Sequence, residues 1–262
     1  MLKKTKYGLA LGGFLLGLSC LAPTAYGQQD PLTLNPQNLV ALKTFIFSGA
    51  RITLSTHGNV VEFESPAGFE HIAIGDIHEG YILCASGTNQ FDVGDSELGF
   101  NAPLTATCPN NTSCTVTRNT SNGLMQLTQT FTLIASERAL KIEMIVKNLS
   151  PSLPLTGVIL RRQVDFDIDS VFNNSHAAPA RDGVFAWNNA ASVPQGHGLM
   201  LRYVRGGTRE AKVNSFETSC SPPDSAQAGP VSGDFTETIQ FQLGNIAPLG
   251  SKSVVVQYQQ SM

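Results

Sequence analysis

The sequence predicts an all-β protein, a large antiparallel β-sandwich of about a dozen strands. Two neighbouring stretches alternate strictly between apolar and polar residues, which is typical of strands with one buried and one wet face. A four-residue turn at 135–138 separates them, as in a hairpin. The apolar positions of the two stretches are Met125, Leu127, Phe131 and Leu133, then Leu140, Ile142, Met144 and Val146.

Turn residues recur at short intervals along the rest of the chain, and no long helical pattern interrupts them. The polar segments 86–112 and 219–233 are expected to be long loops. No repeat or linker composition divides the chain, so we expect one domain over residues 28–262. Further strands are expected at 52–54, 60–64, 81–84, 113–118, 157–169, 184–187, 198–204, 238–243 and 254–258.

Residues 1–27 have the pattern of a signal peptide. Three lysines precede an apolar, glycine-rich run at 9–21, and Ala25 and Gly27 supply small residues before a cleavage point. We expect cleavage after Gly27 and a secreted or periplasmic protein. Lipidation at Cys20 is the less favoured alternative, because Gly17 replaces the leucine usual in lipoprotein cleavage boxes.

The charge balance argues against nucleic acid as a partner. Removing residues 1–27 takes away three lysines and no acids, so the net charge of −3 becomes −6. The remaining lysines and arginines form no cluster that would attract phosphate or anionic lipid. No later segment is apolar enough for a membrane span of ~20 residues.

The cysteines indicate an oxidising compartment. Without Cys20 the chain has Cys84, Cys108, Cys114 and Cys220, an even number. A disulfide between Cys108 and Cys114 would close a short turn-rich loop and leave Cys84 to pair with Cys220. Spacing alone leaves all three connectivities open, and a zinc site is a less favoured alternative because C-x₂-C pairs are lacking.

Three acids suggest a calcium site. If residues 157–169 form one strand, Asp165, Asp167 and Asp169 share a face and repel one another unless a cation or arginine neutralises them. The following sequence departs from the EF-hand pattern, with Ser170 at the position of its glycine. The alternative, which the sequence favours, is hydrated acids or acids paired with Arg161.

Arg162 falls in phase with the apolar positions of the same strand. A buried guanidinium must be paired, and we expect its partner to be Glu79 or Glu70. A structural role is favoured over binding of a ligand.

Other acids allow enzymatic and metal interpretations. Glu70, Glu79 and Asp165 could supply a carboxylate pair for glycoside hydrolysis. A loop with Asn89, Asp92, Asp95 and Glu97 is a second, weaker calcium candidate, and His71, Asp76, His78 and Glu79 could bind a transition metal. No spacing matches a known catalytic motif, which favours a non-catalytic protein.

Trp187, the single tryptophan, lies next to Phe185 and two asparagines. Its ring could stack on a sugar ring of a bound glycan. The alternative, which the sequence favours, is a core position, where large aromatic side chains are common.

The chain resembles exported bacterial β-sandwich proteins of no assigned function. The likeness rests on the segments 58–63, 65–68, 79–81 and 161–167. More loosely, the central third is similar to the supersandwich of galactose-mutarotase-like domains. That resemblance implies the fold only, because the mutarotase catalytic His and Glu pattern has no counterpart here.

These observations favour an exported, non-catalytic β-sandwich that binds extracellular glycan or a surface protein. A carbohydrate-active enzyme is the second hypothesis, and a structural protein stabilised by calcium is the third. No cofactor other than calcium is implied.

Overall fold

The alternating central stretch folds as the predicted hairpin. In the computed structural model, which describes residues 39–47, 49–73, 78–188, 197–220 and 227–261, strand β9 (Met125–Ile134) pairs with β10 (Ala139–Asn148). A 3-10 turn, η1 (Ala135–Glu137), joins them. Leu140 lies opposite Leu133 and Val146 opposite Leu127. The predicted pattern of two wet and two buried faces is confirmed.

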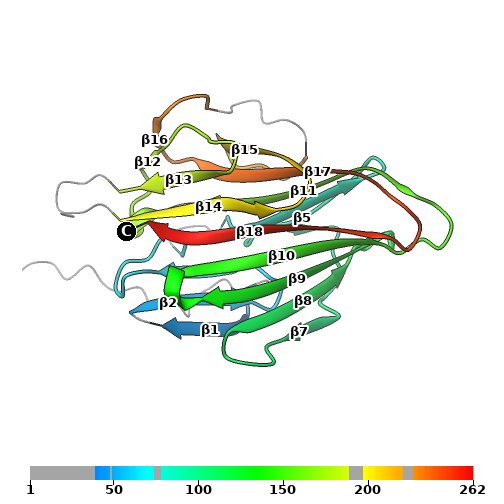
Figure 1. Cartoon of the computed structure of the whole chain (residues 1–262), viewed down its shortest axis with the longest axis horizontal. Helices are drawn as coiled ribbons and strands as arrows, with labels where there is room; N and C mark the ends of the chain where they lie inside the picture. Colours follow the sequence, from blue (N-terminus) through cyan, green and yellow to red (C-terminus); the bar gives the residue numbers. More distant parts are fainter. Residues whose placement is uncertain (1–38, 48, 74–77, 189–196, 221–226, 262) are drawn as a thin grey trace, which may run out of the picture. The chain divides into compact units, whose positions relative to one another are not determined.

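This hairpin lies inside a nine-stranded antiparallel sheet, in which β18, β10, β9 and β8 run side by side (Figure 1). The order across the sheet is β16 (Val231–Gly233), β12 (Asn174–His176), β13 (Gly183–Trp187), β14 (Gly198–Arg205), β18 (Ser251–Ser261), β10, β9, β8 (Ser113–Asn119) and β7 (Thr105–Thr107).

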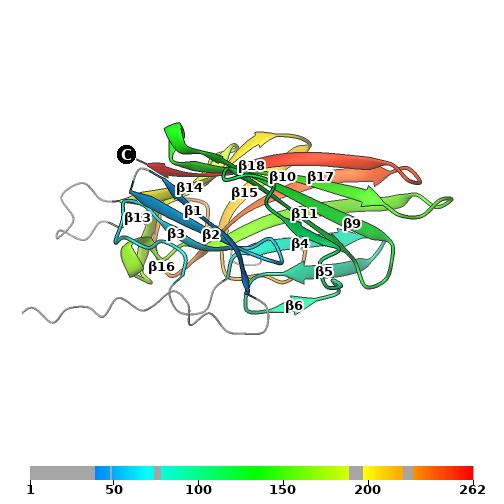
Figure 2. The same ribbon diagram turned by 90° about the horizontal axis from the view of Figure 1, so that it is seen from below.

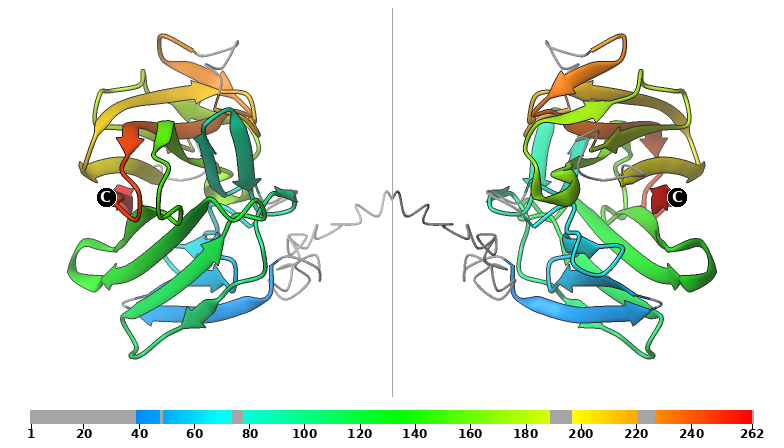
Figure 3. Two further views of the ribbon diagram at one scale, coloured as in Figure 1. Left: turned by 90° about the vertical axis from the view of Figure 1, so that its right-hand side faces the viewer. Right: turned by 90° about the vertical axis from the view of Figure 1, so that its left-hand side faces the viewer.

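Two smaller antiparallel sheets complete the fold. Figure 2 shows β4, β5 and β6 of the six-stranded sheet, and Figure 3 shows the three-stranded sheet in blue beside the green strands of the hairpin. The six-stranded order is β15 (Thr208–Asn214), β17 (Thr236–Ile246), β11 (Leu155–Asp165), β4 (Gly80–Ala85), β5 (Thr88–Asp92) and β6 (Glu97–Leu98). The three-stranded order is β1 (Ala41–Phe47), β2 (Ala50–Ser55) and β3 (Val60–Glu64).

The all-β fold class is therefore confirmed, with 18 strands in the described residues where the sequence predicted about a dozen. The difference comes mainly from short strands. Residues 86–112, expected to be a loop, contain β5, β6 and β7. Strands of two to five residues carry too little alternation to be recognised in a polar sequence.

One apolar core joins the three sheets. It receives Leu127 and Ile142 from the hairpin, Leu160 from β11, and Ile52 and Phe63 from the three-stranded sheet, all 0–1% exposed. Because strands of all three sheets contribute apolar side chains, no single element could bury this surface alone.

A buried ion pair crosses this core. Arg162 on β11 donates from Nε to Glu79 Oε1 at 2.7 Å and from Nη1 to Gln129 Oε1 on β9 at 2.7 Å. Tyr258 on β18 donates to the same Glu79 oxygen at 2.7 Å. Both charged side chains are 0% exposed. The predicted pairing of Arg162 with Glu79 is confirmed, and the guanidinium offers no surface to a ligand.

Gly58, between β2 and β3, allows the three-stranded sheet to form hydrogen bonds with Arg162 and Glu79. Its backbone has φ of +90°, and a Cβ there would lie 2.3 Å from the Gln129 side chain. Without that side chain, the Gly58 carbonyl accepts a hydrogen bond from Arg162 Nη1 at 3.3 Å. Val60 donates its backbone N–H to Glu79 Oε2 at 2.6 Å.

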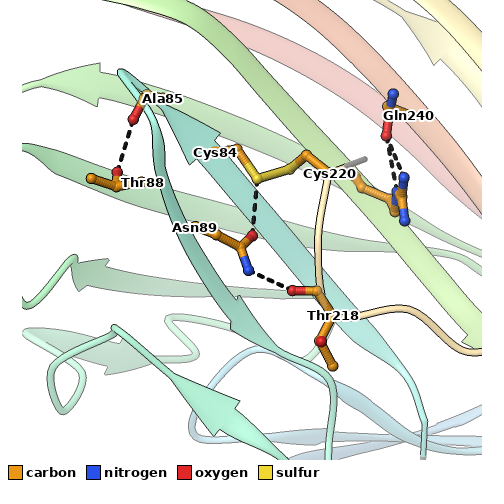
Figure 4. Close-up of a disulfide and its surroundings, with 8 residues drawn as sticks. Cys84, Ala85, Thr88, Asn89, Thr218, Cys220 and Gln240 are labelled. Atoms are coloured by element: carbon orange, nitrogen blue, oxygen red, sulfur yellow. Dashed lines mark hydrogen bonds between the residues drawn. A yellow bond between two sulfur atoms is a disulfide. The ribbon is translucent and has the colours of Figure 1, made fainter. Parts of the chain in front are cut away.

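Two disulfides are present, Cys84–Cys220 and Cys108–Cys114. Figure 4 shows the first, which attaches the segment after β15 to strand β4. Asn89 strengthens the attachment, since its Nδ2 donates to the Thr218 carbonyl at 2.7 Å. These crosslinks indicate an oxidising compartment. The predicted signal peptide, residues 1–27, lies outside the described residues.

The two disulfides should differ in their effect on stability. Cys84–Cys220 spans 136 residues and Cys108–Cys114 spans 6. From loop-closure entropy, we expect alanine replacement of the pair to cost about 5 kcal/mol for the long loop and about 2 kcal/mol for the short one. Urea unfolding of the two double variants measures this, and an equal loss would contradict the expectation.

Candidate functional site

The acids at the end of β11 do not share one strand face. The strand ends at Asp165, and the chain then turns through η2 (Ile168–Ser170). Asp167 donates its backbone N–H to the His71 carbonyl, and Asp169 has a left-handed φ of 59°. The expectation of a single strand over 157–169 was therefore wrong, because the hydrogen bond from Asp167 to His71 and the left-handed turn at Asp169 replace the β-ladder after Asp165.

Asp169 consequently points to other partners. His197 Nδ1 lies 2.7 Å from Asp169 Oδ1, and Asn188 Nδ2 donates to Oδ2 at 3.2 Å. The backbone N–H of Asp169 donates to His71 Nδ1 at 3.2 Å. Asp169 is thus paired outside the predicted calcium set.

Asp234, between β16 and β17, takes the place that the sequence assigned to Asp169. One carboxylate oxygen from each of Asp165, Asp167 and Asp234 lies within 4.8 Å of the others. Asp167 is 3% exposed, Asp165 is half-buried and Asp234 is exposed. We call Asp165, Asp167 and Asp234 the acidic group.

Burial and nearby negative charge raise the pKa of carboxyl groups in and beside the acidic group. Burial, followed by the nearby charges of Asp165 and Asp234, raises the pKa of Asp167 to about 8. Burial also raises the pKa of Glu237 to about 7, although its hydrogen bond with His176 opposes the shift. These carboxyl groups lie in a region where negative charge is poorly compensated.

The glycosidase candidates do not converge in this way. Glu79 is inside the core with Arg162, as described above. Glu70 accepts backbone N–H groups of Phe63 at 2.7 Å and Ile72 at 3.0 Å, and burial raises its pKa to about 7. Both carboxylates already have internal partners. Asp165 belongs to the acidic group.

The loop acids predicted as a second calcium site separate into different contacts. Asp92 and Glu97 meet His57 and Arg118, whereas Asn89 contacts Thr218. His57 Nδ1 lies 3.2 Å from Asp92 and 2.9 Å from Glu97. Arg118 contacts the same two carboxylates at 2.5 and 2.7 Å. Two negative and two positive groups balance here when His57 is protonated.

His57 and Arg118 were not among the predicted site residues. Arg118 could have been found from the alternation along β8, because it lies on the same strand face as Cys114 and Val116, which are buried. A charged residue in that phase requires a partner. His57 lies in a turn and carries no comparable signal.

The histidines proposed for a transition metal also separate. His71 Nε2 lies 2.8 Å from the Ser65 carbonyl, and burial lowers the His71 pKa. His78 lies 3.6 Å from Asp165 and from Asp95, with its ring against Phe216. Asp76, the fourth candidate, lies outside the described residues.

Trp187 lies on the outer face of β13. Val184 and Ala186 enter the core, so Phe185 and Trp187 project to the opposite side, where both are half-buried. Their rings stack with centroids 5.5 Å apart and an interplanar angle of 16°. Gly198, opposite Trp187, leaves room for this pair, since a Cβ there would lie 2.6 Å from the Phe185 ring.

Comparison with known proteins identifies the fold. No family model and no curated protein sequence matches the chain. The structure of a bacterial glucoamylase complexed with acarbose matches with a TM-score of 0.58 and 10% identity, over 86% of this chain and 33% of the other. The chain therefore corresponds to about one third of that protein.

Two further solved structures match with lower TM-scores. A putative aldose 1-epimerase from Escherichia coli K12 gives a TM-score of 0.44 and 10% identity, over 85% of this chain and 99% of the other. A galactose mutarotase-like protein from Lactobacillus casei gives 0.42 and 10%, over 84% and 99%. The likeness to the glucoamylase structure agrees with the antiparallel β-sandwich fold described above. Across the described ranges no helix is long and apolar enough to cross a membrane.

The balanced group around His57 predicts a dependence of stability on pH. Hydrogen bonds with Asp92 and Glu97 raise the pKa of His57 from 6.5 to about 9. The stabilisation is thus fully present below pH 6.5 and is lost as the pH rises through 9.

We expect the advantage of the native protein over His57→Gln to be up to about 3 kcal/mol at pH 6 and to shrink toward pH 10. Urea unfolding of both proteins across this range measures it. A constant difference between the two proteins would show that the proton on His57 contributes nothing.

Proposed function

We propose that this protein is an exported, single-domain, non-catalytic binding protein for extracellular carbohydrate. The observation that carries the proposal is the stacked pair of Phe185 and Trp187 on the outer face of β13. Aromatic rings there offer an apolar face to the C–H groups of a sugar ring, while the indole N–H can donate to a hydroxyl.

The neighbours of Trp187 suit a polyhydroxylated ligand. Ser175 on β12 pairs with Trp187 and with Ser232 on β16, so the three side chains share one face of the sheet. The two serine hydroxyls lie 3.2 Å apart. Ser175 is 5% exposed and Ser232 is exposed, so the Ser232 hydroxyl and the aromatic side chain on this face provide both kinds of contact that a sugar makes.

Binding is better supported than hydrolysis. A glycosidase needs two carboxyl groups about 5–9.5 Å apart on either side of the scissile bond. Glu79 is fully buried in an ion pair and Glu70 is bound to backbone N–H groups. Neither is available to a substrate in this arrangement.

The fold and the crosslinks are consistent with this proposal. One protein of similar fold is a bacterial glucoamylase complexed with acarbose. The two disulfides suit a secreted or periplasmic protein, as does the predicted cleavage after Gly27.

Screening of the oxidised protein on an array of neutral oligosaccharides, with acarbose included, tests the proposal. We expect at least one glycan to bind, and Trp187→Ala to weaken its affinity tenfold or more because a central aromatic contact is lost. Titration calorimetry of the strongest glycan gives the affinities.

Phe172→Ala is the matched control, because Phe172 is an aromatic residue 51% exposed outside the pair. Its affinity should equal that of the native protein. Absence of any bound glycan, or equal losses in both variants, would contradict the proposal, and capture of a protein ligand by the same face would replace carbohydrate with protein as the partner.

A further inference from the structure

We propose that the acidic group, Asp165, Asp167 and Asp234, binds one calcium ion. The site is independent of the carbohydrate proposal, since it uses other residues at the end of β11 and before β17. It also differs from the set predicted from the sequence, because Asp234 replaces Asp169.

The spacing of the three carboxylates fits a shared ion. Oxygen ligands lie 2.3–2.6 Å from calcium, so two ligands of one ion are at most ~5.2 Å apart. The three candidate oxygen atoms lie within 4.8 Å of one another. Their oxygens can therefore contact one ion with small adjustments of the side chains.

A second observation points to a ligand. Asp167 is 3% exposed, and its Oδ1 is buried without any hydrogen-bond partner. Oδ1 of Asp165, in the same group, is also buried and unpartnered. Buried carboxylate oxygens are nearly always satisfied, because losing water without a replacement is costly. A cation between these atoms would satisfy them together.

The charges around the group are unbalanced, unlike those around His57. Among the described residues, no lysine or arginine forms an ion pair with any of the three acids. The basic side chains that face them are His78, 3.6 Å from Asp165, and His176, which is bound to Glu237. Glu70 and Glu237 add further negative charge to the environment of Asp167.

The ligand chemistry selects calcium. All three donors are carboxylates, which suit a hard cation, and calcium accepts 6–8 oxygen ligands in flexible geometry. Exposed Asp234 leaves one side open to solvent, so water can complete the coordination. The ion would join the end of the long strand β11 to the segment that follows β16. Strand β16 has only three residues.

Thermal unfolding and titration calorimetry of the full protein test this site with calcium chloride as the probe, after treatment with EDTA. We expect one ion per chain, and a rise in Tm of about 5–10 °C at a calcium concentration 100 times Kd. Asp167→Asn and Asp234→Asn should each reduce the calcium affinity at least tenfold. Exposed Asp234→Asn should fold normally, so a loss there reports binding.

Asp182→Asn is the control, because Asp182 is an exposed aspartate paired with Arg209. It should respond to calcium like the native protein. The competing arrangement is a proton shared between Asp167 and a neighbouring carboxylate. In that case calcium leaves Tm unchanged while Asp167→Asn raises Tm, and this result would overturn the proposal. An equal calcium response in all four proteins would overturn it too.

Discussion

The buried pair of Arg162 and Glu79 is the interaction on which the arrangement of the three sheets depends. Arg162 belongs to the six-stranded sheet, and its guanidinium also reaches Gln129 of the nine-stranded sheet and the carbonyl of Gly58 beside β3. Glu79 accepts hydrogen bonds from Tyr258 and Val60 in return. Two buried charges tolerate little displacement, because separating them would leave both unpaired inside the core. The pair therefore fixes how the sheets pack.

Buried charge is handled in two different ways within this fold. Around Glu79 and around His57, each carboxylate faces arginine or histidine, and these groups serve the structure. At Asp165, Asp167 and Asp234, three carboxylates come together, and the ion pairs described for them contain only His78, 3.6 Å from Asp165. The unbalanced group and the outward aromatic pair at Phe185 and Trp187 are thus the two places where we propose that the chain binds a ligand.

Much of the fold could be predicted because period-2 alternation records which strand face is buried, as in the β9–β10 hairpin. The phase of Arg162 on the apolar face likewise predicted a carboxylate partner, Glu79 or Glu70, and the structure has Glu79. The acidic group could be predicted only in part, since Asp234 is distant in sequence from Asp167 and comes near it only through the pairing of β17 with β11. Asp169 does not join the acidic group because the backbone takes a left-handed turn at this non-glycine residue. Sequence patterns do not reveal such a turn.

A double-mutant cycle on Arg162 and Glu79 tests the central claim most directly. The free energy of unfolding in urea is measured at pH 7 for Arg162→Met, Glu79→Gln and the double variant. The account predicts that Arg162→Met costs about 3–5 kcal/mol, because Glu79 is left buried and unpaired, and that the double variant recovers part of this loss. Additive losses in the double variant would show that the two side chains stabilise the fold separately, and would contradict the account.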